Sequence, residues 1–239
     1  LAIRAPEVNE LHSFGLHQGV AGIEEGDPNL KPETSLKGVL TNQLNFSGNF
    51  LIELSIFAQY VRNYIFLEPQ EASRLTIRGA FPVFLYRQTN ATLTGSDFTA
   101  KWEPNQNWEV TAKYSMVRGQ DISGQLPLVF MPADNIHFSL SRFLSDFGPL
   151  HNTRIGITAR YVSEQTKLEP GQDFLPPPGA YFLPGLEAES RIAIRENNLR
   201  LSVQILNVLN VQYRDYLNRL RYYADEQGRN IRLSLTWEM

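Results

Sequence analysis

Cysteine is absent from this 239-residue chain, which excludes disulfides, thiolate metal sites and cysteine nucleophiles. No apolar run approaches the roughly 18 residues that a membrane-spanning helix needs, so a helical membrane protein is excluded as well. Neither sign of charge dominates: 22 basic and 25 acidic side chains give a formal charge of −3, too balanced for a protein that binds nucleic acid by neutralising phosphates. The chain starts at Leu1 without an initiating Met or a signal peptide, so we expect a piece of a longer protein or a processed product.

Apolar and polar residues alternate along nearly the whole chain. Near the C-terminus, Ile231, Leu233 and Leu235 alternate with Arg232 and Ser234, as in a strand with one apolar and one wet face. A helix would place residues i and i+2 on different faces, so a helical interpretation fails. The predicted strands are 34–46, 50–66, 86–102, 108–118, 135–145, 153–166, 182–195, 199–211 and 230–239, with a short segment at 1–4. Most of them cover the roughly 9–11 residues that a tilted strand needs to cross a bilayer.

The connections between these strands alternate in length. The short ones are 47–49, 104–107, 146–152 and 196–198, and the long ones are 5–33, 67–85, 119–134, 167–181 and 212–229. Short turns at one end and long loops at the other are typical of an outer-membrane β-barrel. Aromatic residues support this interpretation because they gather near the strand ends, where a bilayer interface favours them. The turn-end belt is Phe46, Phe50, Trp102, Trp108, Phe143 and Trp237, and the loop-end belt is Tyr60, Tyr64, Tyr114, Tyr161 and Tyr213.

Nine strands and a short segment do not make a wide closed barrel, and an open sheet would leave unpaired edges. We therefore expect residues 1–239 to form a single partial domain, the C-terminal portion of a larger antiparallel barrel. The polar faces should line a wet or plugged lumen, with seven charged residues facing inward: Glu109, Lys113, Arg154, Arg160, Glu187, Glu189 and Arg191. Glu187 and Glu189 could also be read as an acid/base pair, but no nucleophile or metal site accompanies them, so we do not expect an enzyme.

Several motifs resemble those of a known family. The first part of the chain contains Ile3-Arg4-Ala5-Pro6, then Asn9-Glu10-Leu11, then 27–33 (Asp-Pro-Asn-Leu-Lys-Pro-Glu). Together these segments resemble the mid-barrel signature of TonB-dependent outer-membrane receptors. Near the other end, 207–210 (Asn-Val-Leu-Asn) followed by Tyr213 is similar to the penultimate-strand motif of the same family. The segment 228–238 is similar to their closing strand, although the chain ends in Met239 where the family usually has an aromatic residue. The resemblance implies a 22-stranded barrel with an N-terminal plug in a Gram-negative outer membrane, of which this chain would hold about the last ten strands. The plug, the earlier strands and the region that contacts the TonB complex would lie outside this chain.

The first long loop contains candidate metal ligands. His12 and His17 are followed by Glu24, Glu25 and Asp27, and imidazoles with carboxylates suit zinc, while imidazole also ligates haem iron. The placement of histidine between the segments 3–6 and 27–33 resembles the arrangement in haem receptors. The stretches 86–95 and 213–230 resemble the corresponding parts of metal-related receptors, including the outer-membrane zinc receptor. The alternative is that the loop histidines only form hydrogen bonds with nearby backbone.

The last long loop contains arginines and tyrosines that suit an anionic, aromatic siderophore through charge and stacking. The candidate ligand-binding residues are His12, His17, Arg214, Tyr216, Arg219, Arg221 and Tyr222. The alternative is a solvated loop. Cargo is therefore expected to be zinc, haem or a ferric siderophore, with no intrinsic cofactor.

Two local features carry further expectations. The Pro-rich stretch 169–184 should be a stiff, extended connector, and 95–97 should hold a β-bulge because Leu93 and Phe98 otherwise face opposite ways. Three functions remain open: an active transport receptor, a passive or structural porin-like barrel, and a soluble all-β binding module.

Overall fold

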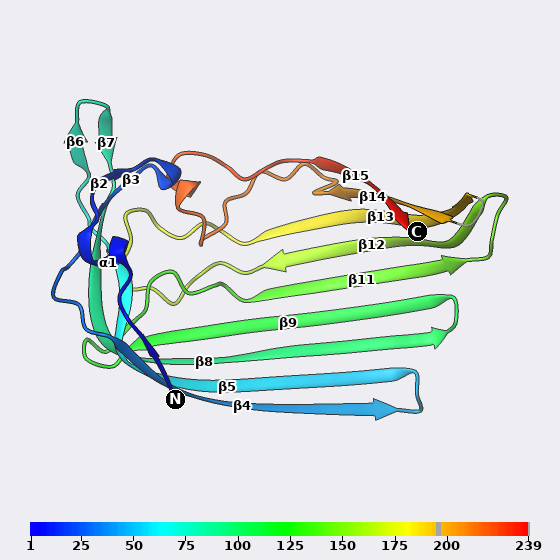
Figure 1. The fold of residues 1–239 in the computed structure, drawn as a ribbon, viewed down its shortest axis with the longest axis horizontal. Coiled ribbons are helices and arrows are strands. Elements are labelled where there is room, and N and C mark those ends of the chain that lie inside the picture. The colour runs from blue at the N-terminus through cyan, green and yellow to red at the C-terminus, as the bar shows by residue number, and fades with distance from the viewer. Residues whose placement is uncertain (195–196, 239) are drawn as a thin grey trace.

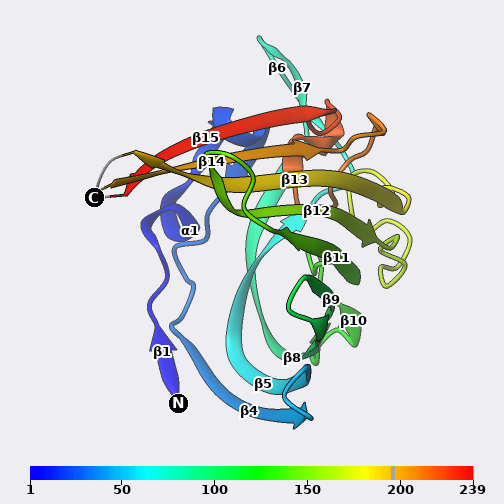
Figure 2. The ribbon, with the colours of Figure 1, turned by 90° about the vertical axis from the view of Figure 1, so that its right-hand side faces the viewer.

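The computed structural model describes residues 1–194 and 197–238. Ten strands follow one another in a single antiparallel path, so the predicted all-β architecture and its strand order are confirmed. They are β1 (Ala2–Arg4), β4 (Glu33–Phe46), β5 (Phe50–Pro69), β8 (Val83–Asn105), β9 (Trp108–Asp121), β11 (Asn135–Leu144), β12 (Leu150–Val162), β13 (Tyr181–Ile194), β14 (Asn197–Leu206) and β15 (Asn230–Glu238). Within the described residues, β1 and β15 do not pair with each other, so the sheet is curved but open (Figures 1 and 2).

Residues directly opposite each other on paired strands share one face of a sheet, and the register gives this sheet one apolar and one polar face. An unbroken apolar row crosses β4 to β15: Phe46, Phe50, Trp102, Val110, Leu140, Ile157, Leu186, Ile205 and Ile231. A parallel polar row crosses β9 to β15: Glu109, Ser141, Gly156, Glu187, Gln204 and Arg232. The alternation in the sequence therefore survives in three dimensions as two continuous surfaces.

The connections sort to opposite ends as expected. The three short turns after β4, β8 and β11 lie at one end, and the long loops lie at the other (Figure 1). The predicted turn 196–198 and the terminal Met239 fall partly or wholly outside the described residues. No helix among residues 1–194 and 197–238 has the length and apolar character to cross a membrane.

The long loops contain structure that alternation does not predict. The loop 5–33 holds α1 (Val8–His12), β2 (Phe14–His17), a 3₁₀ turn η1 (Gln18–Val20) and β3 (Gly22–Glu25). The loop 67–85 holds the hairpin β6 (Arg74–Thr76) and β7 (Gly79–Phe81), and β10 (Leu126–Pro127) and the 3₁₀ turn η2 (Arg219–Tyr222) lie in two further loops. The β2–β3 hairpin folds back so that β3 pairs in parallel with β8. The loop end is therefore a packed layer.

The bulge predicted at 95–97 is wrong. Strand β8 keeps an unbroken register with β5 and with β9 through this segment. Gly95 leaves room for a neighbouring ring, because a Cβ there would lie 2.5 Å from Cε1 of Phe57. The bulge lies instead in β5 between Val61 and Tyr64, where Asn63 has a φ of 59°. The extra residue turns Tyr64 to the polar face and removes it from the predicted aromatic belt.

Two strands end earlier than predicted, and a second residue of the predicted belts lies on the polar face. Strand β12 ends at Val162 rather than 166, and β14 ends at Leu206 rather than 211. The motif 207–210 is a turn in which Asn207 and Asn210 both adopt positive φ. Asn207 is buried, and its side chain both donates to and accepts from the backbone of Val211 at 2.9 and 2.8 Å. Phe143 pairs with Arg154 on the polar face, so proximity to a turn did not decide its orientation.

Candidate functional site

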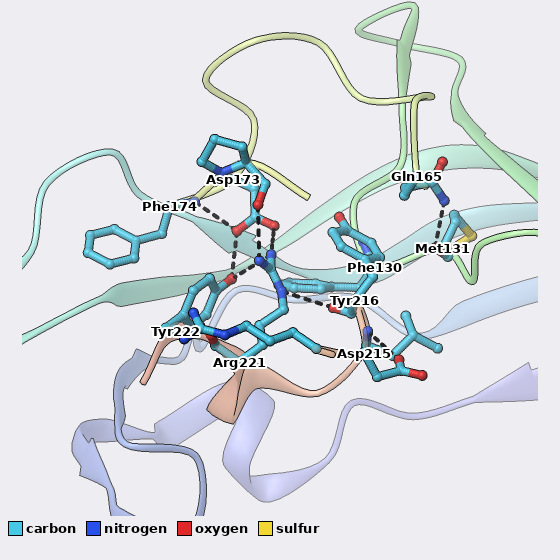
Figure 3. A network of polar contacts seen from close by, with 12 residues as sticks. Phe130, Met131, Gln165, Asp173, Phe174, Asp215, Tyr216, Arg221 and Tyr222 are labelled. Carbon is cyan, nitrogen blue, oxygen red and sulfur yellow. Dashed lines mark hydrogen bonds and ion pairs between the residues drawn. The ribbon is translucent and has the colours of Figure 1, made fainter. Parts of the chain in front are cut away.

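A buried ion pair holds two long loops together at the loop end. Arg221 of η2 contacts Asp173 of the Pro-rich loop, and each side chain is only 3% exposed. Tyr222 donates a hydrogen bond to the same carboxylate at 2.6 Å, and Arg221 donates from Nε to the carbonyl of Tyr216 at 3.1 Å. Figure 3 shows these side chains converging between the loops. Burial, reinforced by Asp173, raises the pKa of Tyr222 above its ordinary value. This tyrosine therefore stays a neutral donor.

Aromatic rings pack around this pair. Arg221 lies 4.5 Å from the ring centroid of Tyr222 and 5.0 Å from that of Tyr216. The ring of Phe174 meets Tyr222 edge-on at 5.6 Å, and Phe130 lies 6.0 Å from Tyr216. Such contacts suit a guanidinium, which stacks on aromatic faces more readily than an ammonium does. The predicted connector 169–184 is thus an anchored part of a loop core.

A second buried carboxylate connects the first long loop with the last. Glu24 of β3 is 4% exposed and accepts from Nη1 of Arg219 at 2.6 Å, and its Oε1 lies 3.1 Å from Nδ1 of His17. Tyr86 of β8 donates to the other oxygen at 3.3 Å. Burial on its own would raise the pKa of Glu24, but hydrogen bonds with His17 and Arg219 outweigh it and hold the pKa below its ordinary value. Tyr223 adds a hydrogen bond to the carbonyl of Ala21 at 2.7 Å.

The structure brings only part of the predicted metal set together. His17 and Glu24 form one pair, Glu25 contacts Arg74, and the Asp27 carboxylate accepts from the backbone of Asn29 at 2.9 Å. His12 lies at the end of α1. In the described ranges, no three His, Cys, Asp or Glu side chains gather closely enough to hold a metal ion. The predicted five residues therefore do not form a preassembled centre there.

The predicted ligand-binding residues of the last loop fall into two classes. Arg221, Tyr216 and Tyr222 are buried in the loop core. Arg214 is more exposed and pairs with Asp225 at 2.7 Å, whereas Arg219 binds Glu24. Contact of any of them with cargo stays a prediction. Sequence reasoning missed Asp173 and the buried Phe84, whose ring centroid lies 5.3 Å from the guanidinium carbon of Arg219. It included Tyr86 in the stretch 86–95 but did not indicate its contact with Glu24. The available signal for Asp173 was that it is one of only two carboxylates in the Pro-rich stretch 169–184.

All seven charged residues predicted to face inward lie on the polar face by register. Some of them pair there: Arg154 lies 3.4 Å from Glu187, and Lys101 lies 2.9 Å from Glu109. The side chains of Glu187 and Glu109 are only about one-fifth exposed (19% and 21%), whereas Ile157 and Leu186 on the apolar face are 48% and 44% exposed. Side chains on the concave side of a curved sheet shield one another from solvent, so this difference in exposure is expected if the polar face is the concave one.

The fold and these two faces can be compared with known proteins. A model of the TonB-dependent receptor-like β-barrel family matches residues 2–208. The chain belongs to this family. No curated protein matches the chain by sequence.

Solved structures share the barrel fold with this TonB-dependent receptor chain. The copper transporter OprC is 19% identical with a TM-score of 0.74, over 96% of this chain and 34% of that one. A variant of the ferric enterobactin receptor PfeA from Pseudomonas aeruginosa is 16% identical with a TM-score of 0.65, over 98% of this chain and 36% of that one. The FrpB iron transporter (F5-1 variant) from Neisseria meningitidis is 17% identical with a TM-score of 0.63, over 90% of this chain and 33% of that one. The chain therefore spans about a third of each of these receptors and transporters.

Proposed function

We propose that this chain forms the C-terminal part of the barrel of a TonB-dependent receptor that captures a scarce nutrient and imports it across the outer membrane of a Gram-negative bacterium. The observation that carries the proposal is the family match over residues 2–208, on a sheet whose two faces separate apolar from polar side chains. A barrel needs this separation to meet lipid outside and water or a plug inside.

The partners follow from the surfaces. Outer-membrane lipid covers the apolar row from Phe46 to Ile231, and the remaining barrel strands pair with the free edges of β1 and β15. A plug domain and cargo face the polar row, and the seven charged residues on it line the lumen. Coupling to the TonB complex runs through an N-terminal region outside this chain. In this arrangement the loop end faces the cell exterior, and the whole of residues 1–239 is one part of one domain.

The cargo is a metal ion, haem or a ferric siderophore. Support comes from the structural relatives, which are a copper transporter, an iron transporter and a ferric enterobactin receptor. Within this chain, His12 and His17 are the residues we propose for contact with a metal or haem, because both belong to the loop that packs over the barrel mouth. His17 is the better placed, since its side chain is 56% exposed.

Uptake by a strain that lacks the gene tests this proposal. Growth is measured with zinc, copper, haem or ferric siderophore as the limiting nutrient, with and without the restored gene. We expect rescue with one nutrient, and the rescue should be abolished by a protonophore or by loss of TonB. Rescue that survives both treatments would instead establish the passive, porin-like alternative.

A double substitution separates metal or haem contact from other roles. Changing both His12 and His17 to Ala should reduce uptake of zinc or haem at limiting concentration. The matched control is His151→Ala, because His151 lies at the turn end beside Asp146, 2.9 Å away. Equal uptake by the wild type and the double variant would remove the histidines from the cargo site.

A further inference from the structure

Two leucines interrupt the polar face near the loop end. Leu183 of β13 lies opposite Arg160 of β12, and Leu206 of β14 lies opposite Asn230 of β15, so both leucines are on the polar face. They line one cavity of about 240 Å³, together with Pro184 and Tyr213. This volume is below the roughly 300–1,000 Å³ of pockets for drug-sized ligands. The cavity therefore suits a small molecule or one arm of a larger one.

Basic side chains lie along the other side of this cavity. His137 of β11 and Arg160 line it directly, and the register places His137 between Arg160 and Lys113 of β9. Throughout 1–194 and 197–238, no hydrogen bond involves the side chains of these three residues, and the nearest carboxylate to Arg160 is that of Asp215 at 3.9 Å. Asp215 is already engaged by the hydroxyl of Tyr181 at 2.8 Å. Arg160 therefore forms one long ion pair with Asp215, and in the described part of the chain its N–H groups donate no hydrogen bond.

Arg160 and Lys113 lie on either side of His137 in this row, and neither faces a carboxylate directly across the sheet. An anion bound beside Arg160 and His137 would supply the missing counter-charge. Apolar walls beside a cationic end are the complement of an acid with a flat or aliphatic body.

We propose that this cavity is a subsite for the carboxylate of a small organic acid, with Arg160 and His137 binding the anion and Leu183, Leu206 and Tyr213 packing on its apolar body. The subsite rests on the proposed function and deepens it, because it names the chemistry of one part of the cargo. The acid is either a free molecule or one arm of a metal chelate.

Ligand-observed NMR titrations of the complete receptor in detergent micelles test the subsite, with benzoate as the probe and benzamide as its neutral isostere. Empty micelles give the background. Benzoate should bind the wild type, and benzamide at least tenfold more weakly, because one charge-assisted hydrogen bond contributes about 1.5–3 kcal/mol. Arg160→Gln should weaken benzoate binding about tenfold or more, and His137→Gln should weaken it less. The control is Arg154→Gln, which lies on the same strand face but pairs with Glu187, away from the cavity.

The result overturns the subsite if the wild type does not bind benzoate, if benzamide binds equally well, or if Arg160→Gln has no more effect than Arg154→Gln. A carboxylate of the plug already seated there would give the first of these outcomes. A competition experiment distinguishes the two sources of the acid. If the iron(III) complex of 2,3-dihydroxybenzoate displaces benzoate at concentrations where free 2,3-dihydroxybenzoate does not, the subsite binds one arm of a metal chelate. Equal displacement identifies the free acid. Because this binding needs neither TonB nor energy, loss of benzoate binding with intact uptake rejects the subsite alone, and the reverse rejects the proposed transport alone.

Discussion

Removing Arg221 should open the loop core while leaving the barrel strands intact. Arg221 and Asp173 are each 3% exposed, so Arg221→Met leaves a buried carboxylate without its cation. Breaking a buried ion pair in this way costs about 3–5 kcal/mol. The free energy of local opening of the loops 167–181 and 212–229 should fall by that amount. Their amide hydrogen exchange should then be about one hundred to several thousand times faster, since every 1.4 kcal/mol corresponds to a factor of ten.

Hydrogen exchange followed by mass spectrometry on the complete receptor measures this change peptide by peptide. Asp225→Ala is the matched control, because Arg214 and Asp225 are 39% and 41% exposed and an exposed pair contributes only about 0–1 kcal/mol. This change keeps the hydrogen bond from Arg214 to the carbonyl of Arg221. Replacing both buried partners, with Arg221→Met and Asp173→Leu, should recover much of the protection. If Arg221→Met and Asp225→Ala accelerate exchange equally, the buried ion pair does not hold these loops together.

Three further substitutions test other contacts. Because the folded-state pKa of Glu24 lies below its ordinary 4.5, its carboxylate stabilises the loop layer fully above about pH 4.5, and this stabilisation is lost as the pH falls through the folded pKa. Protection factors of 14–25, which correct for the intrinsic pH dependence of amide exchange, should therefore fall at low pH in the wild type, whereas those of Glu24→Gln should be low throughout. Protection that does not change with pH in the wild type would contradict this. Asn207→Ala should lower the thermal unfolding midpoint, because it removes two hydrogen bonds and places alanine at a positive φ, at a cost of about 2–3 kcal/mol. Asn207→Gly should cost less, because glycine adopts a positive φ without strain. If Asn207→Gly costs more than Asn207→Ala, the positive φ does not contribute to the loss. Gly95→Val should reduce the folded yield, because its Cβ would meet Phe57, and Phe57→Ala in the same chain should restore part of it.

The strands and their faces could be predicted because alternation is a local signal with a period that only a strand satisfies. Alternation places Ile157 and Leu186 on one face and Glu187 on the other without knowledge of the partners. It does not locate an inserted residue, and for this reason the bulge was predicted at Gly95, where the chain is regular. The true bulge, at Asn63, depends on a positive φ that asparagine tolerates better than most residues.

The loop layer could not be predicted because its contacts join residues far apart in the sequence. Arg219 and Glu24 are 195 positions apart, and Arg221 and Asp173 are 48 apart. Composition drew attention to the arginines and tyrosines of 212–229 as candidate ligand-binding residues, and that role stays a prediction. It did not indicate that Arg221 and Tyr222 would be buried against a carboxylate from another loop, which is a property of tertiary packing.

Single-cysteine labelling tests the central claim, the orientation of the two faces. The chain has no cysteine of its own, so Leu186→Cys and Glu187→Cys each introduce the only thiol of this chain, on neighbouring residues of β13. Spin labels attached to these thiols in the receptor reconstituted in lipid are exposed to oxygen, which concentrates in the bilayer, or to a water-soluble nickel complex. Oxygen should relax the label at 186 more strongly, and the nickel complex should relax the label at 187 more strongly. The reverse pattern, or equal access at both positions, would contradict this orientation.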